Sequence, residues 1–155
     1  MNKVIIKKTP NGDTRSLKVL DKNLVYQDTV HHIQGVQDVM KAVAEALIEQ
    51  SKNHDYTKLG KYYDDFFAAL SSGLKAEEFY KLPWWKIHKT KERHHLNQHY
   101  PDDVNLIDVI EMLCDCVAAG KARTGNVYPI RLPNAVLQLA VENTVKMLIE
   151  NVEAE

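Results

Sequence analysis

The sequence is poor in the features that mark several classes of protein. Its 155 residues contain no run of the roughly 18 to 20 apolar residues that a membrane span requires, and the apolar stretch near the N-terminus is too short for a signal peptide. The two cysteines, Cys114 and Cys116, are one residue apart, a spacing that suits neither a disulfide nor half of a paired zinc site. The 20 basic and 21 acidic residues leave a net charge of −1, so no overall charge draws the chain to nucleic acid or an anionic membrane. These absences predict a cytoplasmic protein with reduced thiols.

The length and an ordinary hydrophobic content predict one globular domain over residues 1–155. Short β-prone runs on both sides of Asn11-Gly12 predict an N-terminal β-hairpin over residues 1–22, because this dipeptide favours a tight hairpin turn. The rest of the chain shows helical spacing of apolar residues, interrupted by breakers. We therefore expect an all-α helical bundle with a small β-hairpin appendage.

The predicted helices follow from caps and breakers. The first begins at Asp28 or Thr29 and the last, which Asn134 caps, covers residues 134–153. In the last helix a stripe of Leu137, Val141, Thr144, Leu148 and Val152 is expected to face the core. Between them we expect helices over residues 59–70, 76–80, from Pro83 towards Tyr100, and 104–119, the last capped by Asp102 or Asp103 and ending on Gly120.

All seven histidines lie between residues 31 and 99, which raises the question of whether they share a site. The most specific local signal is the adjacent pair His54-Asp55. Side by side, an imidazole and a carboxylate supply the mixed nitrogen and oxygen donors that divalent transition metals accept. Asp55 could instead only cap the helix that follows.

His32 is a second candidate ligand on the first predicted helix. At about 100° per residue it falls on the apolar arc of that helix, whereas His31 points away from it. The arc consists of Val36, Val39, Met40, Val43 and Leu47. A histidine that faces the core is expected to be hydrogen-bonded there or to bind a metal, because an unpaired buried imidazole is costly.

Three acidic residues share one face of the helix predicted over residues 104–119. Asp108, Glu111 and Asp115 lie within roughly 60° of one another around the helix axis. Three like charges on one face repel each other unless a cation or basic partners neutralise them. The face could also be a solvated one, opposite the apolar arc.

The segment from Trp84 to His99 combines histidines with basic residues. His95 and His99 are four residues apart and could share a helical face and one metal ion, with His94 beside them. The surrounding cations are Lys86, Lys89, Lys91 and Arg93. The same segment could be a basic nucleic-acid surface anchored by its two tryptophans, or a plain solvated helix. His31 and His88 are expected to be bystanders.

In chain order the sequence contains His32, the segment His54-Asp55-Tyr-Thr-Lys58-Leu, the pair His94-His95, and Asp115 within EMLCD. This order resembles the HD-domain superfamily of metal-dependent phosphohydrolases, whose signature is a single His, an adjacent His-Asp and a distal Asp on a helical bundle. The resemblance is to divergent phage and bacterial members with a central HH pair. It covers roughly residues 28–123, which would form the metal-site core.

The resemblance implies roles for individual residues. His32, His54, Asp55 and Asp115 would bind the metal, with Asp108 as a rival for the last position. His94 and His95 would hold a second ion or contact phosphate, and Asp55 would also be central to catalysis. Glu111 is the candidate general base and Lys58 and Arg93 the candidate catalytic phosphate clamps. Further substrate contacts are expected from Lys61, His99, Lys121 and Arg123.

These features together predict a phosphohydrolase that depends on one or two divalent ions and acts on a nucleotide or another small phosphorylated substrate. Manganese, iron, cobalt, nickel, zinc and magnesium all remain open as the metal. Two alternatives belong to other classes. One is a non-catalytic HD-like module that binds metal or nucleotide, and the other is a nucleic-acid-binding protein that uses the Trp84–His99 segment. Exposed tryptophans in that segment would also favour a homodimer.

Overall fold

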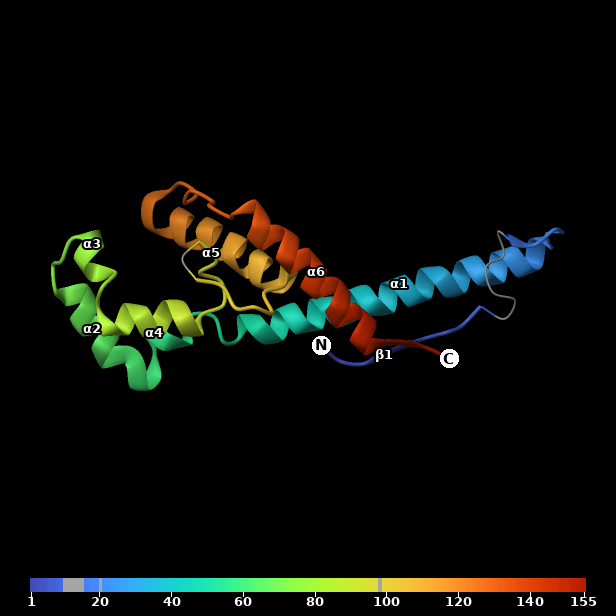
Figure 1. The fold of residues 1–155 in the computed structure, drawn as a ribbon, viewed down its shortest axis with the longest axis horizontal. Helices are drawn as coiled ribbons and strands as arrows, with labels where there is room; N and C mark the ends of the chain where they lie inside the picture. The colour runs from blue at the N-terminus through green and yellow to red at the C-terminus, as the bar shows by residue number, and fades with distance from the viewer. Residues whose placement is uncertain (10–15, 20, 98) are drawn as a thin grey trace. The chain divides into compact units, whose positions relative to one another are not determined.

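The computed structural model describes residues 1–9, 16–19, 21–97 and 99–155 (Figure 1). The chain divides into two compact units: unit 1, Met1–Ile48 with Val145–Glu155, and unit 2, Glu49–Thr144. Helices dominate the described residues, which confirms the all-α prediction. None of the described helices has both the length and the apolar character that a bilayer span needs. The elements in chain order are β1 (Val4–Ile6), α1 (Lys22–Ser51), the 3-10 helices η2 (Tyr56–Lys58) and η3 (Gly60–Tyr62), α2 (Tyr63–Ser71), α3 (Ala76–Phe79), α4 (Pro83–Lys91), α5 (Leu106–Thr124), α6 (Asn134–Asn151) and β2 (Val152–Ala154).

In unit 1 the first strand pairs with the last. β1 and β2 run parallel, with Val4 opposite Val152, and Figure 1 shows the blue N-terminal strand beside the red C-terminal end. The predicted hairpin over residues 1–22 is therefore wrong: residues 16–19 form no strand, and its turn at Asn11-Gly12 lies outside the described residues. The long-range pairing prevails because β1 also packs on α1, where Ile6 lies over Gly35.

α1 begins about two turns earlier than predicted. Asp21 caps it, because its Oδ1 accepts hydrogen bonds of 2.9 Å from the backbone N–H groups of Asn23 and Leu24. Asp28 and Thr29, the expected caps, lie inside the helix. The sequence interpretation missed Asp21 as the N-cap because apolar residues show little helical spacing in the first two turns of α1.

The buried face of α1 also differs from the predicted arc. The helix buries Gly35 and Ala42, while Val36 and Met40 are 45% and 66% exposed. Small residues occupy the buried face because they allow neighbouring backbone to approach closely. His32, which was expected on the core-facing arc, is exposed.

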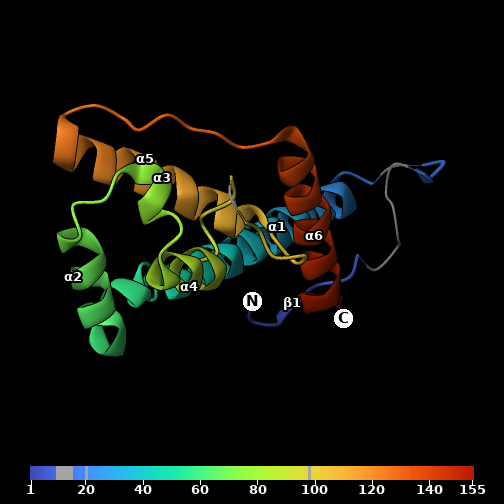
Figure 2. The same ribbon diagram turned by 60° about the vertical axis from the view of Figure 1, so that its left-hand side comes forward.

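Unit 2 begins with short helices close to their predicted positions. α2 ends at Ser71 and α4 begins at Pro83, as the breakers indicated. Figure 2 shows α2, α3 and α4 beside one another, and α2 and α4 are in contact. α4 stops at Lys91 instead of reaching Tyr100, because Glu92 takes an extended conformation. His94, His95 and His99 therefore lie on a loop and not on a helical face.

α5 is held by caps at both ends. Asn105, and not Asp102 or Asp103, caps the N-terminus: its side chain accepts from the N–H of Ile107, while Asp108 accepts from the N–H of Asn105. The helix passes the predicted stop at Gly120 and ends at Gly125, whose φ of 77° suits glycine. Gly120 is needed inside the helix because a Cβ there would lie 2.5 Å from the carbonyl oxygen of Asn126.

The hydrophobic core described for unit 2 lies between α5, α6 and the loop that leads into α5. It consists of Leu96, Val104, Val109, Met112, Val136 and Ala140. α6 begins at Asn134 as predicted, but its buried face is Val136, Ala140 and Thr144. The predicted stripe is confirmed at Thr144 but wrong at Leu137 and Val141, which are exposed.

Candidate metal centre

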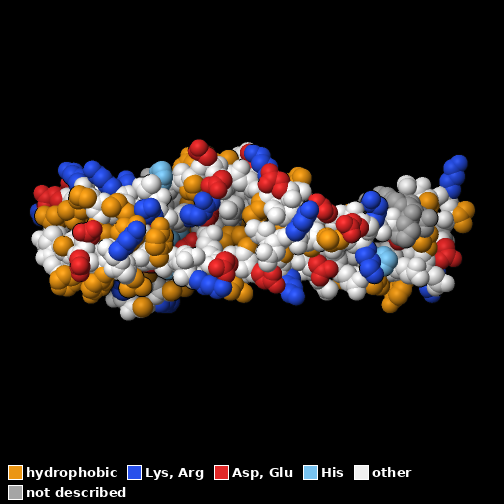
Figure 3. Space-filling view, turned by 90° about the horizontal axis from the view of Figure 1, so that it is seen from below, with side chains coloured by type: hydrophobic (Ala, Val, Ile, Leu, Met, Phe, Trp, Pro, Cys, Tyr) orange, Lys and Arg blue, Asp and Glu red, His pale blue; other side chains and the backbone are white. Residues whose placement is uncertain are grey.

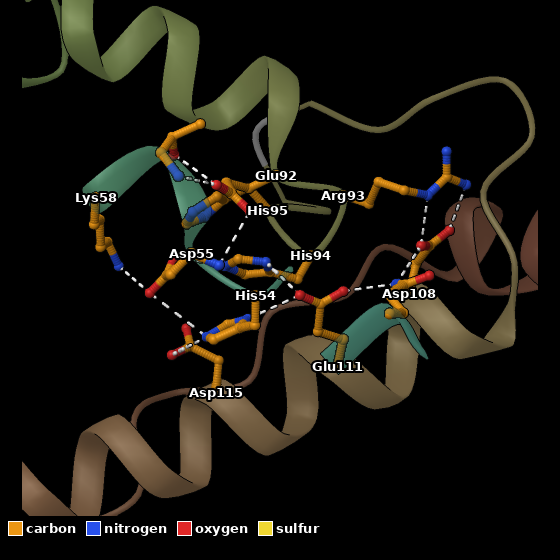
Figure 4. A network of polar contacts seen from close by, with 12 residues as sticks. His54, Asp55, Lys58, Glu92, Arg93, His94, His95, Asp108, Glu111 and Asp115 are labelled. Atoms are coloured by element: carbon orange, nitrogen blue, oxygen red, sulfur yellow. Dashed lines mark hydrogen bonds and ion pairs between the residues drawn. The ribbon is translucent and has the colours of Figure 1, made fainter. Parts of the chain in front are cut away.

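The centre of the site is the backbone turn that follows α1. Asp55 adopts the left-handed conformation, with φ 58° and ψ 24°, which costs a non-glycine residue about 1 to 3 kcal/mol. Glu92 stabilises the turn, because its carboxylate accepts from the backbone N–H groups of Asp55 (3.2 Å) and Thr57 (2.9 Å). The turn presents His54 and Asp55 side by side to the rest of the site (Figure 4).

Donor atoms from three segments converge at this turn. His54 Nε2 lies 3.5 Å from Asp55 Oδ2, and His94 Nε2 lies 3.6 Å from Asp55 Oδ1. Asp115, which projects from α5, places Oδ1 3.7 Å from His54 Nε2. Two donors that each lie about 2.1 Å from one cation are separated by roughly 3.0 to 3.7 Å at angles of about 90° to 125°. These separations fit a shared cation better than direct hydrogen bonds.

Glu111 holds the opposite edges of both imidazoles. Its Oε1 lies 2.8 Å from His54 Nδ1 and 3.1 Å from His94 Nδ1, and its Oε2 accepts a hydrogen bond from Gln50. Burial alone would raise the pKa of Glu111, but these contacts hold it well below the usual range. With Nδ1 engaged by the carboxylate, Nε2 of each ring faces Asp55.

The charge balance around His54 follows from its carboxylate neighbours. The nearby carboxylates of Asp115 and Glu111 raise the pKa of His54 to about 10, against the opposing effect of burial. The pKa of Asp115 is lowered in turn, mainly by its interaction with His54. The pocket of carboxylates therefore favours a positive charge at this position, carried either by a proton or by a cation.

Three buried polar atoms in the described part of the site have no hydrogen-bond partner: Asp55 Oδ1 and both ring nitrogens of His94. His94 Nδ1 has its ion-pair contact with Glu111, whereas His94 Nε2 and Asp55 Oδ1 face each other at 3.6 Å. A buried polar atom without a partner costs about 1 to 3 kcal/mol. A cation between the two atoms would satisfy both, so His54, Asp55 and His94 form a group that could hold a metal ion.

A second group of this kind shares Asp55 and adds His88 and His95. His88 Nε2 lies 3.7 Å from Asp55 Oδ1 and 2.7 Å from His95 Nε2. Burial, aided by the neighbouring histidines, lowers the pKa of His88 to about 3 and that of His95 to about 4. Both imidazoles are therefore neutral near pH 7 and can donate a nitrogen lone pair.

Five of the predicted metal ligands come together in unit 2: His54, Asp55, His94, His95 and Asp115. His32 belongs to unit 1, is exposed, and is in neither of the metal-binding groups found among the described residues. Its predicted place on a core-facing arc is wrong, because the side chain is exposed, while its role as a metal ligand stays a prediction.

The structure gives Arg93 and Asp108 a structural contact. The guanidinium makes a bidentate pair with Asp108, with contacts of 2.7 and 2.8 Å, and Asp108 is fully buried. Arg93 also donates to the carboxylate and the backbone carbonyl of Asp103. These contacts occupy the guanidinium of Arg93 and the carboxylate of Asp108 with each other, and Glu111 contacts the two histidines. The roles of Arg93 as a phosphate clamp, Asp108 as a metal ligand and Glu111 as a general base stay predictions that this arrangement does not favour.

The remaining residues that were predicted to contact the substrate lie in different parts of the structure. Lys58 forms an ion pair with Asp55 Oδ2 at the edge of the site. Lys61 is exposed and lies over the ring of Tyr62. His99 is exposed, as are Lys121 and Arg123 in the last turns of α5, and no contact joins these three side chains to the described site.

The sequence interpretation missed His88, Thr57 and Glu92. The signal for His88 was its position four residues after Trp84, which places both side chains on one face of α4; the rings stack with centroids 4.7 Å apart. The role of Glu92 could not be read from local spacing, because it depends on the turn at residues 55–57, more than 30 residues earlier.

The chain belongs to the family described as "Family of unknown function (DUF5662)", whose profile matches residues 21–153. This range includes every residue of the site. Comparisons with curated proteins and with solved structures gave no match. The chemistry of the site is therefore argued from its geometry.

Proposed function

We propose that the protein is a divalent-metal-dependent phosphohydrolase in which His54, Asp55, His94 and Asp115 hold the metal ion. The observation that carries this proposal is the pair of buried, unpartnered atoms Asp55 Oδ1 and His94 Nε2, at a separation that suits two ligands of one cation. The mixed imidazole and carboxylate donors suit manganese, iron, cobalt, nickel or zinc, and magnesium less well.

The site has an open side from which a substrate can approach. The side chains of His54 and Asp115 are 31% and 28% exposed, whereas His94 and Glu111 behind them are buried. A bound divalent ion would lower the pKa of its water towards neutrality and polarise the scissile P–O bond. Lys58, which lies at the edge of the site against Asp55, can neutralise a phosphate oxygen. The substrate that fits is a small phosphate ester or anhydride, and a nucleotide is the favoured class.

The proposal keeps the resemblance to HD domains but changes one ligand. The His54-Asp55 pair and the distal Asp115 occupy the places that the resemblance implies. The single upstream histidine is replaced by His94 from the loop after α4. A cytoplasmic location is part of the same proposal and agrees with free thiols at Cys114 and Cys116.

Two alternatives make different use of the same chain. A non-catalytic metal- or nucleotide-binding module would keep the metal without turnover. A nucleic-acid surface on the Trp84–His99 segment is disfavoured because Trp84 is buried and both tryptophans pack in an aromatic cluster with Phe79. On the face shown in Figure 3, basic side chains are interspersed with acidic ones.

The test begins with the metal content of the purified protein, measured by elemental analysis for the wild type, Asp55→Asn, His94→Ala and the exposed control His99→Ala. We expect stoichiometric metal in the wild type and the control and its loss in the two site variants. Phosphate release from p-nitrophenyl phosphate and nucleoside mono-, di- and triphosphates is then followed with that metal added. Metal without turnover on any substrate would favour the binding module, and a protein that takes up no metal would overturn both readings.

A further inference from the structure

We propose that α1 packs against α1 of a second copy of this chain and forms a two-helix coiled coil over residues 26–47. This range belongs to unit 1, and α1 is one continuous helix through it (Figure 1). The surface differs from the Trp84–His99 segment that the sequence suggested for a homodimer, where Trp84 is buried. The proposal goes beyond the metal-dependent activity and does not depend on it.

The apolar residues of α1 repeat every seven positions. They form a stripe, called the α1 seam below, in which Thr29 is the polar exception: Tyr26, Thr29, Ile33, Val36, Met40, Val43 and Leu47. Alternating steps of three and four residues keep side chains on one stripe of a helix, and a stripe sustained over about three heptads is typical of a coiled coil. At the next position of the repeat, Gln50 donates hydrogen bonds to Asp108 and Glu111, so the seam ends at Leu47.

Much of the α1 seam is exposed. Tyr26 and Met40 are 70% and 66% exposed, and Ile33 and Val36 are 47% and 45% exposed. A contiguous exposed apolar surface marks an interaction site more often than a chance pattern does. Most of the arc that the sequence predicted to face the core belongs to this seam, so the apolar spacing is explained by a core that a second chain completes.

The rest of unit 1 covers a different side of α1. Gly35 and Ala42 face their own unit, and Ile6 of β1 lies over Gly35. The centre of the α1 seam lies roughly 130° from Gly35 around the helix axis, at about 100° per residue. Among its described residues, unit 1 buries two hydrophobic side chains, Val4 and Ala42. This core is small even for a unit of roughly 60 residues, a size at which domains are marginally stable, and burial of the seam would enlarge it.

The positions beside the α1 seam favour a second copy as the partner. They contain no Asp, Glu, Lys or Arg: Val30, His32, Gln37, Val39, Ala44 and Ala46. The charged residues Asp38, Lys41 and Glu45 occupy other positions of the repeat. Charges beside a seam normally select one partner and repel others. Two copies of α1 therefore meet without like-charge repulsion, and no charge pattern selects a different chain.

A groove beside the α1 seam gives a second helix room to interlock. Val39 and Met40 of α1 and Ile6 of β1 line a space of about 450 Å³ within unit 1. Side chains of a packed helix insert into hollows of this kind on the facing surface. Lys7 and Lys8, which also line the groove, are exposed, so their ammonium groups can stay in solvent when it is filled.

The experiment is sedimentation equilibrium of the full-length protein from low to high micromolar concentration. We expect the wild type to form a dimer. Ile33→Glu and Met40→Glu should each raise the dissociation constant of the dimer by about a hundredfold or more, because like charges would meet inside the interface. Gln34→Glu is the matched control: it adds the same charge to an exposed position of α1 outside the seam and should leave the dimer unchanged.

Both seam substitutions are at exposed positions, and far-ultraviolet circular dichroism checks that the helix content is kept. A wild type that stays monomeric at every concentration would overturn the proposal, even if a variant does not fold. So would a dimer of unchanged affinity in the two seam variants, since the copies would then meet through another surface. Neither result bears on metal content or phosphate release, which test the proposed function separately.

Discussion

Glu111 Oε1 lies 2.8 Å from His54 Nδ1. The same oxygen is 3.1 Å from Nδ1 of His94, so one buried carboxylate atom faces both imidazoles that point towards Asp55. A carboxylate behind a ligating histidine fixes the ring orientation and increases the basicity of the nitrogen that binds the metal. In the proposed site, Glu111 therefore lies behind the ligands, on the side of the imidazoles away from Asp55.

Glu111→Gln is expected to weaken metal binding by about tenfold to a hundredfold, because a neutral amide orients the rings less firmly and does not polarise them. Affinity is measured by competition with a chromophoric chelator. Glu142→Gln, on an exposed part of α6, serves as the control and should bind like the wild type. If Glu111 were the general base instead, the variant would keep its metal affinity and lose only turnover.

The proposed metal ligands show which parts of the site the sequence could predict. His54 and Asp55 are adjacent, so their proximity needs no knowledge of the fold. For the distal carboxylate, the sequence could indicate only a helical face that Asp115 shares with Asp108. The pairing of buried Asp108 with Arg93, from a loop that no periodicity describes, favours Asp115 in the proposal.

The wrong prediction that His32 faces the core has a physical cause that also applies to α6. In both helices the larger apolar residues define one stripe, but the buried face contains small residues such as Ala42 and Ala140. Close approach of backbone selects small side chains, and hydrophobicity-based periodicity gives them little weight. Thr144 is the member of the predicted stripe of α6 that is buried, and its hydroxyl accepts from the N–H of Leu106.

Lys58→Ala should separate metal binding from substrate binding. Lys58 is not a metal ligand, and its ammonium contacts the Asp55 carboxylate as a competing positive charge. Removing it is expected to leave metal affinity equal or higher, while kcat/KM for phosphate release falls by about a hundredfold, the scale of losing one charge-stabilising donor. Lys146→Ala, at an exposed position of α6, is the control and should leave kcat/KM unchanged. A loss of metal in Lys58→Ala would contradict this assignment.

Arg93→Ala is expected to destabilise the protein rather than remove a substrate contact. It leaves the fully buried Asp108 carboxylate with hydrogen bonds from Gln50 and the N–H of Asn105 but without its guanidinium partner. Breaking a buried pair from one side typically costs about 3 to 5 kcal/mol, and we expect about 2 to 4 kcal/mol here because two donors remain. The free energy of unfolding is measured by urea denaturation.

Two further variants test why Arg93→Ala is expected to lose stability. Adding Asp108→Asn to Arg93→Ala removes the unpaired charge and should recover part of the stability, because the penalty of the single variant is mainly that charge. Arg123→Ala, in the exposed last turn of α5, should change the free energy of unfolding by less than about 0.5 kcal/mol. If Arg93→Ala had wild-type stability but no phosphate release, Arg93 would be a substrate contact and not a structural residue. Removal of a structural arginine from a buried pair would lower the free energy of unfolding.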